Sequence, residues 1–376
     1  MNKPVIMQIL PALNQGGVER GTIEMATALK KANWPNFVVS AGGKLTSELD
    51  KLGVEHITLP VASKNPLRML VNALILVQII KEKKVGIIHA RSRAPAWSAY
   101  WASKITKVPF LTTFHGVYNI GGSSLKKWYN SVMTRGKLII AVSNFVGRHI
   151  QENYGISSDK IRVIHRGADV EKFNPSLVSA ERITALLQKW NLKKDRPIIM
   201  LPGRLTRWKG QLVLLEALTL MENKNCFCLF LGSDQGRKAY SQELKDYIKK
   251  NGLIGRVAFV DSCSDMPAAY RFSDVVVSAS TDPEAFGRVI PEAQAMGCLV
   301  VASRHGGATE TIEPEKTGLF AEVGNASSLA GALDRLLSMN EADKEKMIAD
   351  SIDSVRSDFS VQKMCEKTLK VYEELS

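Results

Sequence analysis

The sequence predicts an α/β protein made of two doubly wound, Rossmann-like domains that face each other across a cleft. Short apolar runs typical of buried parallel strands alternate with helical patterns along almost the whole chain. This alternation lapses once, after Asp169, and resumes at Ile198, so it forms two consecutive series. Two such series are typical of two separate doubly wound sheets.

The first series defines a domain expected at residues 1–170. Apolar runs predict its strands, and amphipathic patterns predict the helices between them. The expected strands are Val5–Leu10, Asn36–Ser40, Gly86–His89, Phe110–Thr113, Leu138–Val142 and Ile161–Ile164. The expected helices include Val18–Lys31, Asn65–Lys83, Ala94–Ile105 and Ser143–Asn153.

The second series defines a domain expected at residues 197–360, after a linker at 171–196 in which breaker residues bracket one polar helix. Its expected strands are Ile198–Leu201, Cys226–Leu231, Val257–Val260, Val275–Ser278 and Leu299–Ala302. Its expected helices are Gln211–Leu218, Gln242–Asn251, Met266–Phe272, Arg288–Met296, Ser327–Met339 and Glu341–Ser357. A last helix at 361–376 is expected to complete the first domain.

Composition places the chain among ordinary globular proteins, because 45% of its 376 residues are apolar and 23% are charged. The apolar stretch Met69–Ile80 is too short to span a bilayer, and the start lacks the long apolar segment of a signal peptide. The five cysteines have no zinc-like spacing and are expected to be reduced thiols. We therefore expect a cytoplasmic protein.

The net charge of +13 is confined to the first half of the chain. Residues 1–170 contain 23 Lys and Arg against 9 Asp and Glu, whereas the remaining residues contain 27 against 28. This asymmetry predicts an anionic partner for the first domain, namely a membrane surface, a nucleic acid or an acidic substrate. A basic surface that only aids solubility is the alternative.

Two glutamates eight positions apart, Glu284 and Glu292, follow the strand Val275–Ser278. The first lies where this strand gives way to a helix, and the second lies within the helix. Open α/β sheets bind ligands at such strand ends. Carboxylates there are suited to the hydroxyls of a sugar or a ribose, so the pattern predicts a nucleotide-sugar pocket. The turn Phe286-Gly287 would offer backbone N–H groups to the ligand.

Three cations, Arg204, Arg207 and Lys209, occupy the equivalent loop after Ile198–Leu201. A diphosphate suits them, since a guanidinium binds its oxygens bidentately and an ammonium adds a point charge. We expect Arg204 and Lys209 to bind it and Arg207 to face solvent. An exposed basic loop with no ligand is the alternative.

Weaker signals lie in the first domain. Gly16-Gly17 follows the first strand and precedes a helix, which allows a ligand to approach the backbone, although a simple tight turn fits equally. His115 follows the strand Phe110–Thr113 and is either a ligand-contacting side chain or a structural one. In the second domain, Gly306-Gly307 follows a strand and is expected to line the pocket near the sugar.

Together these motifs resemble the retaining glycosyltransferase family 4, which has the GT-B fold. The resemblance covers nearly the whole chain. It rests on Gly16-Gly17-Val-Glu, His115-Gly116, Gly203-Arg204 with Lys209-Gly210, and the E-x7-E element from Glu284 to Glu292. His165-Arg166 and Gln294 depart from the pattern common in the family, which leaves the sub-family and the donor open.

The resemblance implies a role for each residue. Arg204 and Lys209 would neutralise the donor diphosphate, Glu292 would bind the ribose, and Glu284 would hold the transferred sugar with the N–H groups of Phe286 and Gly287. Gly16 and Gly17 would close over the phosphates, and His115 would contact the sugar. No D-x-D pair is present to bind Mg²⁺, so the two cations are expected to replace a metal, and no cofactor is expected besides a UDP- or GDP-linked donor.

The expected reaction is transfer of a sugar to a glycan or glycolipid acceptor in synthesis of lipopolysaccharide or another envelope glycan. The acceptor domain in this fold is the first one, and it carries the basic excess. Lys126, Lys127 and Trp128 mix cations with an interfacial aromatic, as a membrane-surface helix does, although a core-packing helix fits almost as well. The protein is therefore expected at the inner face of the cytoplasmic membrane.

Three alternatives remain. A soluble glycosyltransferase could act on a small sugar or sugar phosphate, without any dependence on lipid. A non-catalytic nucleotide-sugar-binding protein is remote, because both glutamates and both cations are intact. A nucleic-acid-binding protein is also remote, since no recognised nucleic-acid-binding motif is present and the glutamates would be unexplained.

Overall fold

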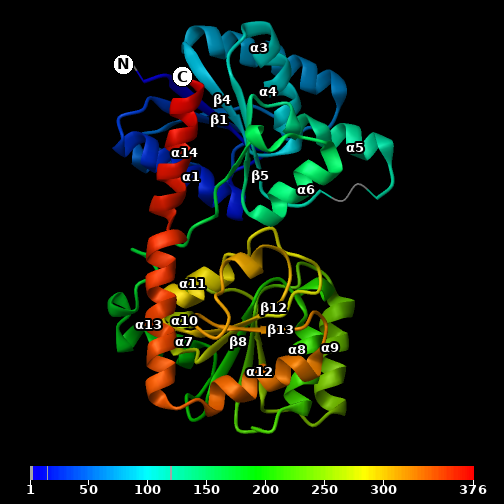
Figure 1. Ribbon diagram of the computed structural model, residues 1–376, viewed down its shortest axis with the longest axis vertical. Coiled ribbons are helices and arrows are strands. Elements are labelled where there is room, and N and C mark those ends of the chain that lie inside the picture. Colours follow the sequence, from blue (N-terminus) through cyan, green and yellow to red (C-terminus); the bar gives the residue numbers. More distant parts are fainter. Residues whose placement is uncertain (1–2, 15, 119–120) are drawn as a thin grey trace. The chain divides into compact units, whose positions relative to one another are not determined.

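The computed structural model of the protein describes residues 3–14, 16–118 and 121–376. The chain divides into two compact units (Figure 1), of which the first is Met1–His165 with Gln362–Ser376 and the second is Arg166–Val361. Each unit is an α/β domain built on one parallel sheet, as the alternating sequence pattern predicts. The fold prediction of two doubly wound domains is confirmed.

The sheet of the first unit has seven strands in the order β3-β2-β1-β4-β5-β6-β7. The strands are β1 Val5–Ile9, β2 Asn36–Ser40, β3 Glu55–Thr58, β4 Val85–Ala90, β5 Phe110–Phe114, β6 Leu138–Ala141 and β7 Ile161–Val163. The helices are α1 Gly17–Lys31, α2 Thr46–Leu52, α3 Pro66–Glu82, α4 Arg93–Thr106, α5 Ser124–Asn130, α6 Asn144–Tyr154 and α14 Val361–Leu375. Short 3-10 turns, η1 Ser131–Thr134 and η2 Ser158–Lys160, join some of them.

The sheet of the second unit has six strands in the order β10-β9-β8-β11-β12-β13. The strands are β8 Ile198–Pro202, β9 Phe227–Leu231, β10 Val257–Val260, β11 Val275–Ser278, β12 Leu299–Ser303 and β13 Leu319–Ala321. The helices are α7 Ala180–Lys189, α8 Gln211–Leu220, α9 Lys238–Lys250, α10 Met266–Phe272, α11 Val289–Ala295, α12 Ala326–Ser338 and α13 Glu341–Asp358. Three 3-10 turns are η3 Pro175–Leu177, η4 Arg207–Lys209 and η5 Gly306–Glu310.

The central strands are apolar along most of their length because helices cover both faces of each sheet. In the second unit, Ile199, Leu201, Val277 and Val301 are almost completely buried in one core that the helices α8 and α12 also line. Continuous apolar runs are therefore the correct signal for these strands, and alternation would have been the wrong one.

Helix α7 shows that the segment expected to be a linker is part of the second unit. Its Arg182 forms two hydrogen bonds, of 2.8 and 2.6 Å, with the carboxylate of Asp265 at the start of α10. The segment expected to be a linker, 171–196, does contain the one helix that its sequence predicts, and it belongs to the second unit. The breaker residues on either side of α7 mark the ends of this packed helix.

Helix α14 belongs to the first unit although it comes after the whole of the second. Its Tyr372 is fully buried, with its hydroxyl oxygen 2.7 Å from Nδ1 of His89 and its ring 6.1 Å from that of Trp34. His89 contacts Thr113 through its other ring nitrogen, at 2.7 Å. Burial, and then the charge of Arg91, lower the pKa of His89, so this histidine is a neutral core residue that anchors α14.

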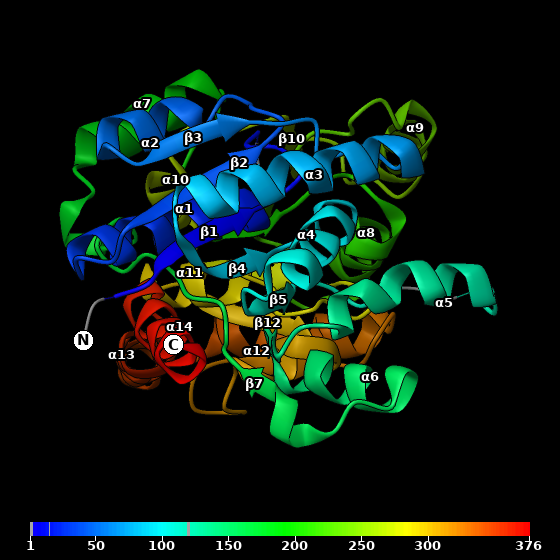
Figure 2. The same cartoon turned by 90° about the horizontal axis from the view of Figure 1, so that it is seen from above.

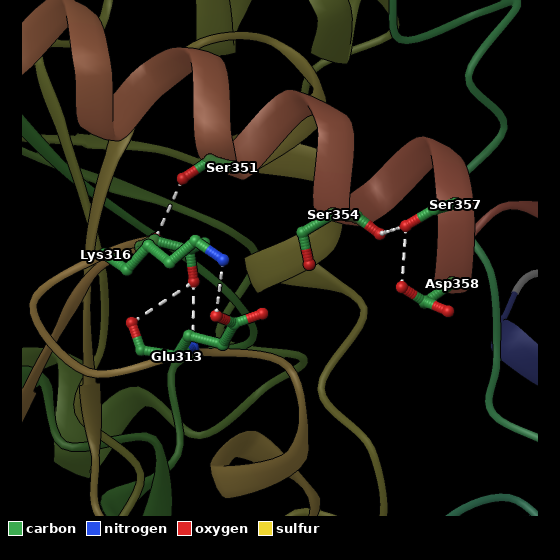
Figure 3. Close-up of polar contacts among 7 residues, drawn as sticks. Glu313, Lys316, Ser351, Ser354, Ser357 and Asp358 are labelled. Carbon is green, nitrogen blue, oxygen red and sulfur yellow. Dashed lines mark hydrogen bonds and ion pairs between the residues drawn. The ribbon is translucent and has the colours of Figure 1, made fainter.

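A loop before β13 links α11 to α13. The carbonyl oxygen of Thr317 accepts hydrogen bonds from Nε2 of Gln294 on α11 and from the hydroxyl of Ser351 on α13, both at 2.9 Å. Figure 3 shows Ser351 reaching from α13 to this loop, in which Lys316 pairs with Glu313 at 2.8 Å. Gln294, a departure from the family pattern in the sequence, thus fixes the position of the helix that bears Glu292.

Candidate active site

The carboxyl ends of β8, β11 and β12 lie next to one another, because β11 pairs with β8 on one side and with β12 on the other. The strand order reverses between β8 and β11, and open α/β sheets bind ligands at such a switch point. The loops that follow these strands, at 203–210, 279–288 and 304–307, contain the predicted donor-binding residues of the second unit except Glu292, which lies in the first turn of α11. The topology therefore gathers these residues at one edge of the sheet.

Lys209 and Glu284 form the centre of this site. The ammonium of Lys209 donates to Oε1 of Glu284 at 2.8 Å, and both side chains are largely buried, with 13% and 15% exposed. The same carboxylate oxygen accepts hydrogen bonds from the hydroxyls of Ser280, at 2.7 Å, and Ser278, at 3.3 Å. The sequence placed one of the pair on the diphosphate and the other on the sugar, and it did not predict that they contact each other.

The electrostatics of Glu284 favour its charged form. Burial by itself would raise the pKa of this carboxyl, but the charge of Lys209 and three side-chain hydrogen bonds outweigh burial and hold the pKa below the ordinary value of 4.5. Glu284 is therefore a carboxylate at neutral pH. It can accept hydrogen bonds from a ligand's hydroxyls, but it cannot act as a proton donor.

Backbone contacts fix the position of Lys209. Gly210 has a φ of 74°, and a Cβ atom there would overlap the carbonyl oxygen of Ala279. The N–H of Thr281 donates to the carbonyl oxygen of Trp208 at 2.7 Å, and the Lys209 ammonium lies 4.5 Å from the centre of the Trp208 ring. The loop after β8 is thus bound tightly to the loop after β11, and only glycine allows this approach at position 210.

Arg204 is exposed, and within the described ranges its side chain has no hydrogen bond or ion pair, which leaves the guanidinium available. Its carbonyl oxygen accepts a hydrogen bond of 3.0 Å from Nε2 of the fully buried Gln211. Arg207 is 68% exposed and bonds Glu243, with one distance of 2.7 Å. The prediction that Arg207 faces solvent is therefore confirmed.

Glu292 lies in the first turn of α11, and both of its carboxylate oxygens have partners. Nε of Arg288, one turn earlier, lies 3.2 Å from Oε1, and the hydroxyl of Tyr270 donates to Oε2 at 3.3 Å. Burial, and then the charge of Glu292, raise the pKa of Tyr270, so this hydroxyl remains protonated and donates. The sequence interpretation missed both partners, although the spacing of four residues between Arg288 and Glu292 is a signal for a helical ion pair.

Gly306 and Gly307, after β12, support the backbone around Glu284. The N–H of Gly307 donates to the carbonyl oxygen of Glu284 at 2.8 Å. A Cβ atom on Gly306 would lie 2.6 Å from that same oxygen, and one on Gly307 would lie 2.6 Å from Cα of Phe286. The Phe286 side chain itself is buried, 6.1 Å from the ring of Phe359, so its predicted role is limited to its backbone. Gly287, with a φ of 82°, completes this turn.

Of the predicted residues of the first unit, Gly16 and Gly17 lie after β1, His115 follows β5, and the others lie on α5. Gly16 is the N-terminal cap of α1, directly before Gly17, and no side chain caps the helix there. His115 directly follows β5 and is partly buried. On α5, Lys126 and Lys127 are exposed, whereas Trp128 is half exposed, with its ring 4.6 Å from that of Trp97 on α4. Helix α5 therefore packs on α4 through Trp128, as a core-packing helix does. It also presents Lys126 and Lys127 to solvent, which leaves the membrane-surface interpretation open.

Family models and solved structures match both units of the chain. The model described as "Glycosyltransferase Family 4" matches residues 15–172, and "Glycosyl transferases group 1" matches residues 183–352. The crystal structure of a glycosyltransferase from Rickettsia africae is 43% identical, covers 100% of this chain and 99% of its own, and has a TM-score of 0.93. The chain belongs to glycosyltransferase family 4. The family prediction is confirmed.

Two further proteins are more distant from this family 4 glycosyltransferase. The structure of Anabaena HepE in complex with UDP-glucose has a TM-score of 0.85, covers 99% of this chain and 100% of its own, and is 23% identical. A transferase from Campylobacter jejuni, named N,N'-diacetylbacillosaminyl-diphospho-undecaprenol alpha-1,3-N-acetylgalactosaminyltransferase, is 26% identical over 82% of this chain and 84% of its own. The solved structures share the GT-B architecture.

In this family 4 glycosyltransferase, replacing Gly307 with alanine should disturb the Glu284 loop. The added Cβ would press on the backbone at Phe286, and such overpacking typically costs about 1–3 kcal/mol of stability. Because a small displacement of a positioned group reduces rates strongly, we expect kcat/KM to fall by about 10²-fold. Thermal unfolding and initial-rate measurements on the same preparation would test this.

Gly331 provides the matched control. It lies in α12, is exposed, and has nothing within 4 Å of an added Cβ. Gly331→Ala should raise stability slightly, by about 0.5–1 kcal/mol, since alanine is the better helix former. Equal activity in Gly307→Ala and Gly331→Ala would show that Gly307 does not position the site.

Proposed function

We propose that this glycosyltransferase transfers a sugar from a UDP- or GDP-linked donor to a glycan or glycolipid acceptor, with retention of anomeric configuration. The observation that supports it best is the buried Lys209–Glu284 pair at the switch point, with the exposed Arg204 in the same loop as Lys209. A diphosphate and the sugar attached to it need cations and a hydroxyl-binding carboxylate side by side. The UDP-glucose complex of Anabaena HepE, which has the same fold, supports this class of donor.

The arrangement favours departure of the diphosphate. When the bond between the anomeric carbon and the phosphate oxygen breaks, its electron pair stays on that oxygen, and negative charge grows there. Fixed cations stabilise this charge more in the transition state than in the ground state. Arg204 and Lys209 would supply this stabilisation without a metal ion, and Glu284 would keep Lys209 oriented until the donor binds.

Retention follows if the acceptor hydroxyl attacks from the face that the diphosphate leaves. The new bond then forms between the acceptor oxygen and the anomeric carbon, and the acceptor's proton passes to the departing phosphate oxygen. Glu284 is held by an ammonium and two serine hydroxyls, which suits it to sugar binding better than to attack on carbon. His115 and the backbone at Gly16-Gly17 would contact the sugar and the phosphates from the first unit.

We further propose that the acceptor is an envelope glycan or its lipid-linked precursor, at the inner face of the cytoplasmic membrane. The name of the Campylobacter jejuni relative includes a diphospho-undecaprenol, which is a lipid carrier. The basic excess of the first 170 residues supports attachment to an anionic surface. Among the described residues, no helix has the length and apolar character needed to cross a membrane.

A thermal-shift screen of UDP- and GDP-linked sugars tests the donor class. One nucleotide series should raise the melting temperature in a concentration-dependent way, because a ligand that binds only the folded state stabilises it. The sugar that stabilises most should then be transferred or slowly hydrolysed, and EDTA should leave the rate largely intact. Failure of every nucleotide sugar to bind or react would refute the proposal, and an absolute Mg²⁺ requirement would refute the role of the two cations.

The same assay distinguishes the soluble alternative. Full-rate transfer to a small sugar or sugar phosphate, with no stimulation by lipid-linked acceptors, would replace the envelope acceptor with a small soluble one. It would leave the assignments of Arg204, Lys209, Glu284 and Glu292 unchanged, because these concern only the donor.

A further inference from the structure

Helix α3 has two apolar faces, and only one of them is covered. Met69, Ala73, Leu76 and Ile80 are buried on the side that packs on α4. The opposite side presents large apolar side chains to solvent, which we call the apolar stripe. Its members, with their exposed fractions, are Leu67 75%, Leu70 51%, Val71 49%, Leu74 58% and Ile75 38%.

The spacing of the apolar stripe is that of one helix face, since its positions recur at three and four residues. A soluble helix with one covered face carries polar residues on the other, and a helix that is apolar all round normally lies in a protein core or against lipid. Figure 2 shows α3 crossing the side of the first unit that faces the viewer, with no other helix over it. We therefore expect another molecule to cover the apolar stripe.

The charges around α3 indicate what kind of molecule covers the apolar stripe. Residues 56–151 contain 14 Lys and Arg and a single acidic residue, Glu82. Arg68 on the first turn of α3 and Lys81 on its last are both exposed, and neither forms an ion pair within the ranges that the structure describes. Lys64 and Lys84, just beyond the two ends of the helix, are also exposed. Cations at both ends of an apolar stripe match a bilayer surface, whose head groups are anionic and whose interior is apolar.

The neighbouring helices add to the same surface chemistry. Leu125 of α5 is 72% exposed and stands beside Lys126 and Lys127, and Ile105 at the end of α4 is 56% exposed beside Lys104. Both α3 and α5 pack on α4, α3 through a hydrogen bond from Ser98 to the Met69 carbonyl and α5 through the contact between Trp128 and Trp97. A self-association face is disfavoured, because two copies would bring their excess cations together.

We propose that α3 docks on the anionic membrane, lying in the plane of the interface with the apolar stripe inserted among the lipids. This inference rests on the proposed function and names the element that holds the enzyme at its lipid-linked acceptor. At about 1.5 Å per residue, the 17 residues of α3 give an inserted edge about 25 Å long. The cations at its ends would then lie at the level of the phosphate groups.

Vesicle co-sedimentation of the full chain tests the docking, with phosphatidylcholine vesicles that contain or lack phosphatidylglycerol. The wild type should bind only the anionic vesicles. Leu70→Ser with Leu74→Ser should weaken binding by about 10²-fold, since two large apolar side chains no longer leave water. Arg68→Gln with Lys81→Gln should weaken it by about 30-fold at low salt, because each of the two cations near an anionic surface strengthens binding by about fivefold.

A control and a salt series make the test specific. Leu220 and Ile254 of the second unit are 56% and 71% exposed, so Leu220→Ser with Ile254→Ser removes equally exposed apolar groups elsewhere and should leave binding unchanged. As salt is raised, the Debye length shortens and the difference between the Arg68/Lys81 variant and the wild type should shrink, whereas the Leu70/Leu74 variant should stay weaker at every salt concentration at which the wild type still binds.

Two outcomes would overturn the proposal. One is undiminished vesicle binding by the Leu70/Leu74 variant. The other is a wild-type dimer in solution that this variant dissociates, which would assign the apolar stripe to a second copy of the chain. Nucleotide-sugar binding, measured on the same variants, separates this proposal from the donor assignment. Normal donor binding with no membrane contact would refute only the docking of α3.

Discussion

Replacing Lys209 or Arg204 with alanine is expected to lower kcat/KM for sugar transfer by on the order of 10²-fold or more, while the protein stays folded. In the proposed reaction, each variant removes one of the two cations that stabilise the charge growing on the diphosphate. Lys209→Ala has a second effect, because Glu284 keeps its two serine partners but loses its counter-charge in a largely buried position. We therefore expect Lys209→Ala to be the more damaging of the two and to lower the melting temperature as well.

Arg207→Ala is the matched control for these variants. Arg207 lies in the same loop and bears the same charge, but its side chain is exposed and bonded to Glu243. Its loss should change kcat/KM by less than about threefold, because exposed ion pairs contribute little. Steady-state kinetics on the three variants would show whether Arg204 and Lys209 contribute more to transfer than Arg207 does. A similar loss in all three would mean that only the overall charge of the loop counts, and near-normal turnover in Arg204→Ala and Lys209→Ala would exclude them from the site.

The second large effect is expected at the two glutamates, whose roles differ. Glu284→Gln should leave binding of free UDP or GDP nearly unchanged and reduce transfer by on the order of 10²-fold, since the sugar loses its carboxylate and Lys209 its anchor. Glu292→Gln should instead weaken the free nucleotide itself, because Glu292 is assigned to the ribose. Calorimetry with the nucleotide and with the nucleotide sugar measures the two effects separately. Equal loss of nucleotide affinity in both variants would contradict this division.

The pH dependence of the wild type provides a check on the state of Glu284. The pKa of this carboxyl is lower in the folded protein than its ordinary 4.5, so its ionisation stabilises the fold above 4.5. That contribution is lost only as the pH falls through the lowered folded value. A loss of transfer at a pH between 5 and 7 would therefore come from another group, and it should persist unchanged in Glu284→Gln.

The architecture, and the loops that meet at the switch point of the second sheet, could be predicted because each depends on a strong local signal. Continuous apolar runs identify central strands, and cations or carboxylates placed directly after them identify the ligand-binding edge. The strand β3 was missed because Glu55–Thr58 contains one large apolar residue and lies at the edge of the sheet. The strand β13 was missed because three residues are too few for a periodic pattern.

The pairing within the site could not be predicted in the same way. Lys209 and Glu284 are 75 residues apart, and they meet because β8 and β11 are neighbours in the sheet, an order that no local pattern specifies. Tyr270 and Glu292 likewise lie on different helices, α10 and α11, and no local pattern indicates that these two residues meet. The exposure of the apolar stripe could not be predicted from the sequence either, because α3 is apolar on both its covered and its uncovered face. Only the packing on α4 distinguishes the two faces.

The return of α14 to the first unit has a consequence for biosynthesis. The core of that unit includes Met364, Val371, Tyr372 and Leu375, which follow the whole of the second unit along the chain. Ribosomes make proteins from the amino terminus, and contiguous domains generally fold as they emerge. Here the sheet formed by the first seven strands stays uncovered on its His89 side until residues 364–375 have been translated. The second unit, Arg166–Val361, has no such requirement, so the half of the enzyme that is synthesised first is the half that finishes folding last.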